Sequence, residues 1–251
     1  MDDVLDAAAV THVGYVRARN EDAVGVCGVD RPLEDGVVTT FEAPVPLLVV
    51  VADGLGGHPG GDQASRMAVD AVLAAAPTDA ESLAKALHHA NEAVYAAMDT
   101  PAVNIGMGST VAAVLVSAKG LAVANVGDSE VFVLSDDRLI SLSIADSLGG
   151  ANGLPGVPTC KVTQALGGAA SFHTVDPHVR EFDHSADRLL VCTDGLTNYV
   201  ARPVIADSLR AGNVAQAAES LLSLALDAGG LDNITLVVVD VDGPRSSRGS
   251  R

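Results

Sequence analysis

The chain has 251 residues, which is enough for one large domain with a substantial hydrophobic core. Its formal net charge of −17 argues against nucleic acid as a partner, because the phosphate backbone would repel the protein. No apolar run reaches the roughly 18 residues of a membrane helix, and the acidic first residues lack a signal-peptide pattern, so we expect a cytoplasmic protein without membrane contacts.

The hydrophobic pattern predicts both strands and helices along the chain. In chain order the predicted strands cover 8–17, 23–29, 46–52, 110–117, 121–126, 131–134, 138–142, 178–182, 188–193 and 234–241, and helices are predicted near 64–75, 83–97 and 214–225. The strands have hairpin spacing and the helices occur in groups instead of alternating with them. This order favours an α+β fold in which helices cover two packed sheets.

Two segments lack such a pattern. The stretch 147–159 is rich in glycine and proline and predicts a loop or mobile flap. The tail 243–251 is small, polar and basic, and predicts a disordered end. Neither has the character of a boundary between folded units, so we expect a single folded domain over 8–242.

Two apolar strands end in the same way. The run 47–52 leads into Asp53-Gly54, and the run 189–193 leads into Asp194-Gly195, where glycine is expected to let the backbone turn. A strand buried on both faces has little reason to end in an ionised aspartate unless the charge is paired or binds a metal. Carboxylates select hard cations such as Mg²⁺ or Mn²⁺. The sequence therefore predicts one cation site shared by Asp53 and Asp194.

Other polar segments are ambiguous when each is taken alone. Arg17, with Glu21 and Asp22 after it, taken alone fits a strand that ends in a charged turn better than a phosphate clamp beside groups that orient a metal. Asp128 and Asp232 both fit ordinary turn positions. His58 fits a structural hydrogen-bonding role as well as a catalytic one.

Several familiar sites are excluded by spacing. The glycines of 54–61 match neither the dinucleotide fingerprint nor the P-loop. The histidines and cysteines show no zinc-ligand spacing, and no G-x-S-x-G nucleophile elbow occurs. The remaining candidate chemistry is that of hard divalent cations.

The order of the motifs is more specific than any one of them. The segments are GYVRARNED (14–22), ADGLGGH (52–58), GST (108–110), NVGDS (125–129), DGLT (194–197) and DNIT (232–235). In this order and at these separations the chain resembles the PPM family of metal-dependent Ser/Thr protein phosphatases, the type 2C class, and in particular its compact bacterial members. The resemblance runs from about Thr11 to Val241.

This resemblance implies a fold, a cofactor and a role for each site residue. The fold would be a four-layer α-β-β-α sandwich of two mainly antiparallel sheets flanked by helices. Two tightly bound Mn²⁺ or Mg²⁺ ions would be held near one end of it, with a third, weaker ion possible. By this resemblance Asp53 would bridge the two ions, the carbonyl of Gly54 would bind one of them, and Asp194 and Asp232 would bind the other. Asp128 would share the third ion with Asp194, and Arg17 would bind the substrate phosphate. Outside the ligands, or through water, the site would be contacted by Glu21, Asp22 and Asn233.

The implied activity is hydrolysis of phosphoserine and phosphothreonine in proteins by a metal-activated water, in a monomer that opposes a bacterial Ser/Thr kinase. His58, or a water held by the metal, would protonate the leaving oxygen. One alternative is a catalytically weak relative that serves as a phosphoprotein-binding regulatory module; another is a structural cation-binding protein. The presence of Asp53, Asp194 and Asp232 disfavours the first alternative, and Arg17 disfavours the second.

The chain departs from the family pattern at three places. Glu130 stands where members often carry arginine, and Leu55 stands where some have histidine. The segment Ala145-Asp146-Ser147 differs from the usual Asp-His-Ser. These differences leave substrate selection, the flap and the proton donor open.

Overall fold

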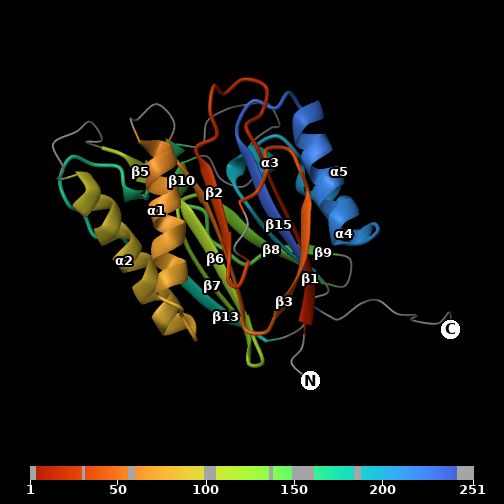
Figure 1. Ribbon diagram of the computed structural model, residues 1–251, viewed down its shortest axis with the longest axis horizontal. Helices are drawn as coiled ribbons and strands as arrows, with labels where there is room; N and C mark the ends of the chain where they lie inside the picture. The colour runs from red at the N-terminus through yellow and green to blue at the C-terminus, as the bar shows by residue number, and fades with distance from the viewer. Residues whose placement is uncertain are drawn as a thin grey trace.

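Two antiparallel sheets packed face to face form the centre of the molecule. The computed structural model describes residues 4–29, 32–55, 60–98, 106–135, 138–148, 161–183 and 188–241. The first sheet has the strand order β3-β1-β15-β14-β8-β9 and the second β13-β7-β6-β4-β2 (Figure 1). The strands of the first sheet are β1 (Val4–His12), β3 (Thr39–Pro44), β8 (Glu130–Ser135), β9 (Arg138–Ser141), β14 (Arg188–Cys192) and β15 (Ile234–Asp240). Those of the second are β2 (Asp22–Val26), β4 (Leu47–Asp53), β6 (Val111–Ser117), β7 (Gly120–Val126) and β13 (His178–Phe182).

Helices cover the outer face of each sheet. On one side of Figure 1, α1 (Gly61–Ala74) and α2 (Ala80–Met98) lie over the second sheet; on the other, α4 (Arg202–Arg210) and α5 (Val214–Asp227) lie over the first. The single-turn helix α3 (Asp194–Thr197) follows β14. Two short strand pairs complete the described elements: β10 (Ser147–Leu148) with β11 (Lys161–Val162), and β5 (Gly108–Ser109) with β12 (Leu166–Gly167). The predicted four-layer α-β-β-α sandwich is thus confirmed.

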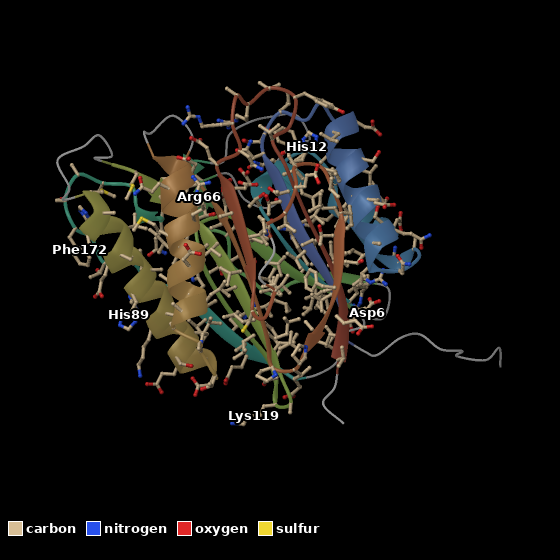
Figure 2. The ribbon with its side chains drawn as sticks, in the orientation of Figure 1. Asp6, His12, Arg66, His89, Lys119 and Phe172 are labelled. Carbon is tan, nitrogen blue, oxygen red and sulfur yellow. The ribbon has the colours of Figure 1, made fainter. Side chains whose placement is uncertain are left out.

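Three apolar layers follow from the alternation of side chains along the strands. In β4, Leu47, Val49 and Val51 point into the layer between the two sheets. Their neighbours Leu48, Val50 and Ala52 point into the layer beneath α1 and α2. A third layer joins the first sheet to α4 and α5. Side chains fill the space between the sheets (Figure 2), which explains why the central strands are continuously apolar.

The predicted strand 8–17 is wrong at both ends, because β1 runs from Val4 to His12. The chain turns at Gly14, whose φ is +79°, and a Cβ there would lie 2.3 Å from the carbonyl oxygen of Asp232. The backbone N–H of Gly14 donates to His12 Nδ1, and that of Tyr15 donates to the carbonyl of Gly230. Arg17 therefore lies on a loop after a turn and not on a strand.

The pattern also missed β3, α3 and α4. β3 is an edge strand with half-exposed side chains, and α4 has only nine residues. Among the described helices, none is long and apolar enough to cross a bilayer. The predicted tail, most of the predicted flap (149–159) and His58 lie outside the described residues.

Candidate metal centre

Four aspartates from separate parts of the chain meet at the end of the sandwich that carries α3. Asp53 ends β4, Asp128 follows β7, Asp194 begins α3, and Asp232 precedes β15. They line one cavity of about 110 Å³, together with Arg17. Antiparallel strands from both sheets end here, which is why residues as far apart as Arg17 and Asp232, 215 positions, become neighbours. The structure thus brings together the predicted ligands Asp53, Gly54, Asp128, Asp194 and Asp232.

The backbone of Asp53 is fixed by hydroxyl groups of the GST segment. Its N–H donates to Thr110 Oγ1 (3.1 Å), and its carbonyl oxygen accepts from Ser109 Oγ (3.0 Å) and from the Thr110 N–H (2.9 Å). Thr110 Oγ1 also shares a hydrogen bond of 2.7 Å with Ser129 Oγ. The sequence showed these hydroxyl residues but assigned them no task; their position at the ends of buried strands was the available signal.

The glycine after each strand-ending aspartate serves close packing instead of the turn we expected. A Cβ on Gly54 would lie 2.4 Å from the Gly61 carbonyl oxygen. On Gly195 it would lie 1.8 Å from that of Asn233. Neither glycine has a positive φ. The missing side chain lets neighbouring backbone reach the cavity wall.

Asp22 and two of the four cavity aspartates each have a buried carboxylate oxygen without a hydrogen-bond donor within the described ranges. Among the described residues, no hydrogen-bond donor reaches Asp22 Oδ1, Asp128 Oδ2 or Asp194 Oδ1. Burial, reinforced by the neighbouring acids, raises the pKa of Asp22 to about 7, that of Asp128 to about 8 and that of Asp194 to about 6. Burial, and then repulsion from Asp22 and Asp194, raises the pKa of Asp53 well above its usual value. Buried carboxylates without donors fit divalent cations, which supply the missing positive charge.

The acids share the cavity without forming a finished cage. In the described part of the chain, no three acidic, histidine or cysteine side chains converge tightly enough to enclose an ion. Two polar contacts account for the spread: Arg17 Nη2 holds Asp232 Oδ2 at 2.7 Å, and Asn198 Nδ2 holds Asp194 Oδ2 at 2.7 Å. The acids nevertheless line one cavity and include oxygens without a described donor, and carboxylate side chains can rotate to meet an ion.

Asn233 holds the loop that carries Arg17 and Glu21. Its side chain accepts from the Glu21 N–H (2.8 Å) and donates to the carbonyls of Val13 (2.8 Å) and Arg19 (3.0 Å). The Asn233 amide therefore holds this loop in place through its oxygen and both of its N–H groups. The prediction placed Asn233 near the ions without a specific task, and the structure gives it this one.

Glu21 and Asp22, predicted as a pair, have different surroundings. Glu21 lines the cavity, and burial raises the pKa of its carboxyl. Asp22 lies opposite Asp53 in the β2–β4 register and accepts a 2.8 Å hydrogen bond from Thr193 Oγ1. Glu21 can thus reach water in the cavity, whereas Asp22 supports the wall.

Comparison with known proteins identifies the family. The model for "Protein phosphatase 2C" matches residues 28–225, well over half of the chain. The chain belongs to the protein phosphatase 2C family. Among solved structures, the Mycobacterium tuberculosis serine/threonine phosphatase PstP/Ppp has a TM-score of 0.78 at 29% identity and covers 95% of this chain and 99% of that one. The PstP catalytic domain in complex with two manganese ions has a TM-score of 0.75 at 28% identity, with the same coverage.

Curated relatives agree with this assignment. The serine/threonine protein phosphatase PstP of Mycobacterium tuberculosis is 32% identical over 95% of this chain, which spans only 45% of that relative's length. The serine/threonine phosphatase stp of Listeria welshimeri is 31% identical over 92% of this chain and 93% of its own length. The protein phosphatase 2C match therefore extends over nearly the whole chain.

Glu130 is the departure from the protein phosphatase 2C pattern that the structure explains best. Its buried carboxylate accepts from Arg202 Nη2 at 2.9 Å, and the guanidinium lies 5.2 Å from the centre of the Phe132 ring. Burial raises the pKa of Glu130. The acid that replaces the expected arginine therefore points to α4, where Arg202 offsets its charge.

Proposed function

We propose that this chain hydrolyses phosphoserine and phosphothreonine in proteins, with two tightly bound Mn²⁺ or Mg²⁺ ions and a third, weaker one. The observation that carries the proposal is a single cavity in which buried aspartate oxygens without donors face an arginine. Family membership and the names of the relatives support protein substrates.

Each candidate ligand has a part in holding the ions. Asp53, Asp194 and Asp232, with the carbonyl of Gly54, would hold the tight pair, and Asp128 would share the weak ion with Asp194. When bound, the ions supply Lewis-acid activation of water and offset the charge of the phosphoryl group. Thr110 and Ser109 keep Asp53 in place through its backbone, so the carboxylate needs no reorganisation of the strand to bind.

Arg17 orients the substrate phosphate. Its side chain is 41% exposed, and its 2.7 Å contact with Asp232 holds the guanidinium at the cavity. A planar guanidinium presents a fork of donors that matches two phosphate oxygens. The positive charge of Arg17 also attracts the dianionic phosphate of the substrate, which the surrounding carboxylates would otherwise repel. Protonation of the leaving oxygen by His58 stays a prediction.

A larger cavity gives the substrate chain a place beside the phosphate. It has a volume of about 840 Å³ and shares Leu55 and Val162 with the aspartate cavity. A peptide running through it would bring its phosphorylated side chain to Arg17. The substrates we propose are phosphoproteins made by a Ser/Thr kinase, and the active form a monomer.

Metal-dependent turnover tests the proposal. We expect the purified chain to release phosphate from p-nitrophenyl phosphate and from phosphothreonine peptides with Mn²⁺, and to stop when EDTA is added. Asp53→Asn should remove this activity, while Asp207→Asn, an exposed acid paired with Arg210 on α4, should not. Mn²⁺-dependent binding of phosphopeptide without hydrolysis would favour the alternative of a phosphoprotein-binding module.

A further inference from the structure

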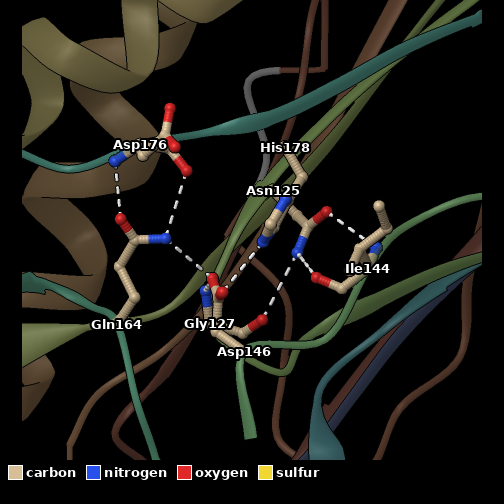
Figure 3. A network of polar contacts seen from close by, with 7 residues as sticks. All are labelled: Asn125, Gly127, Ile144, Asp146, Gln164, Asp176 and His178. Carbon is tan, nitrogen blue, oxygen red and sulfur yellow. Dashed lines mark hydrogen bonds and ion pairs between the residues drawn. The ribbon is translucent and has the colours of Figure 1, made fainter.

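Asp146 is the centre of a polar network beside the aspartate cavity (Figure 3). One carboxylate oxygen, Oδ1, lies 2.8 Å from His178 Nε2. The other, Oδ2, accepts from the Gly127 N–H and from Gln164 Nε2, both at 3.0 Å. The side chain is only 13% exposed. Both oxygens thus have partners, unlike Oδ2 of Asp128, which has none among the described residues.

The network fixes the peptide unit just before Asp128. Asp146 bonds Gly127 twice, since its own N–H also donates to the Gly127 carbonyl at 2.9 Å. Gly127 has a φ of +96°, and a Cβ there would lie 2.6 Å from the Thr110 side chain. Asn125 strengthens the attachment by bonding both Ile144 backbone groups, at 2.7 and 3.1 Å. Little freedom is left in the backbone that aims Asp128.

His178 and Gln164 in turn hold Asp146. His178 stands at the start of β13, so its position is set by the second sheet. Gln164 bonds the backbone of Asp176 in both directions, with its Oε1 accepting at 2.5 Å and its Nε2 donating at 3.1 Å. The carboxylate is therefore oriented from two independent elements (Figure 3).

We propose that Asp146, oriented by His178 and Gln164, is a positioning residue that sets the aim of Asp128 and thereby the affinity of the weak cation site. The inference rests on the proposed function, because it assumes that Asp128 holds that cation. Asp146 touches neither phosphate nor ion; it acts through the Gly127 peptide. Loss of groups that orient a metal ligand lowers metal affinity or activity by roughly 10- to 100-fold.

Calorimetric titration of the full chain with MnCl₂, in the absence of any substrate, tests the inference. We expect Asp146→Ala and His178→Leu to weaken the low-affinity Mn²⁺ phase by about 10-fold or more, leaving the tight phase unchanged. Asp146→Asn and His178→Gln should recover most of the affinity, because they keep an acceptor for Gly127 and a donor for Asp146. Asp128→Ala serves as the reference in which the weak phase is lost.

Asp240→Asn is the matched control, since Asp240 is also a paired acid but lies beside Arg188 at the other end of the first sheet. It should lower the melting temperature without changing the weak phase. Should Asp146→Ala fail to fold by circular dichroism, the two His178 variants decide, because they keep the Asp146 carboxylate and remove or replace only the group that orients its Oδ1.

Three results would overturn the inference. These are a wild-type chain without a weak Mn²⁺ phase, equal weak-phase affinities in wild type, Asp146→Ala and His178→Leu, and an equal loss in Asp240→Asn. A wild-type chain that binds Mn²⁺ in both phases but hydrolyses no phosphate ester would contradict the proposed function and leave the positioning role intact.

Discussion

The charged residues at the two ends of β14 differ in whether their polar atoms have partners. At the first residue, the Arg188 side chain is only 4% exposed, and it bonds both oxygens of Asp240 and the carbonyls of Leu209 and Gly212. Just past the last residue, Asp194 is half-buried, and its buried Oδ1 is reached by no described donor. At the first end, which we call the paired end, the charges of Arg188 and Asp240 offset each other. At the second, the unpaired end, the negative charge of Asp194 lacks a partner among the described residues, and a bound cation can supply one.

Asp194→Asn, at the unpaired end, should have the largest effect on turnover. We expect turnover to fall by about 10²- to 10³-fold or more, the scale for losing one preorganised electrostatic group, because a neutral amide is a poor ligand for a hard cation. With EDTA present at alkaline pH, the same variant should melt at a higher temperature than wild type, since it no longer buries an unsatisfied charge. Phosphate release and thermal melts check the two halves. If Asp194→Asn melted at a lower temperature than wild type in EDTA, the unpaired charge of Asp194 would not be what destabilises the metal-free protein.

Arg188→Met, at the paired end, should lower the stability of the fold. Removing one member of a buried ion pair leaves Asp240 unpaired and costs roughly 3 to 5 kcal/mol of unfolding free energy. The folded fraction should keep its kcat, because the pair is remote from the cavity. Urea denaturation provides the measurement, and the double variant Arg188→Met with Asp240→Leu is the control that should recover part of the loss. A large drop in kcat would mean that the two ends are coupled.

The pH dependence of the metal-free chain should sharpen the contrast. Asp22, Asp128 and Asp194 have pKa values in the fold, about 7, 8 and 6, that lie above those of unfolded aspartate, so the folded state binds more protons. Their contribution is complete at low pH and is lost as the pH rises from about 4 to about 8. In EDTA the melting temperature should therefore fall over this range.

Mn²⁺ should reverse that trend, because the ion binds deprotonated carboxylates. At about 100 times its dissociation constant, a ligand adds about 2.7 kcal/mol of stability. Melts in Mn²⁺ and in EDTA across this pH range make the comparison. A melting temperature that responds to neither pH nor Mn²⁺ would contradict the assignment of the cavity.

Arg17→Ala should have the smallest effect of these changes. The loss of a charge-assisted bond to phosphate is expected to lower kcat/KM by roughly 10- to 100-fold. Arg17→Lys keeps the charge without the fork and should rescue only part of it. Mn²⁺ should still bind in the tight phase, because Asp53, Asp194 and Asp232 all remain, and this separates a phosphate contact from a ligand. Equal kcat/KM in all three proteins would make Arg17 a surface charge.

The parts of the site that the sequence predicted belong to the strands. Asp53 and Asp194 were found because a continuous apolar run that ends in an acid is informative by itself. The fold class followed from hairpin spacing and grouped helices. These signals are local, and tertiary structure did not alter them.

The parts that escaped prediction depend on contacts between distant segments. No local rule shows that Asn233 bonds the backbone of Val13 and Arg19, or that Gly195 is needed because Asn233 approaches its Cα. The end of β1 at His12 is set in the same way, by the packing of Gly14 against Asp232. Such contacts exist only after the sheets have formed.

The position of β15 has a consequence for how the chain is made. β15 lies between β1 and β14, and Ala7 pairs with Val239. Until β15 leaves the ribosome, β1 has no partner on that side, and the first sheet stays in two parts. Pairing over so long a sequence separation closes late and slowly. Since Asp232 and Asn233 immediately precede this strand, the cavity is completed in the same late event, and we expect no cation binding there by a nascent chain that still lacks β15.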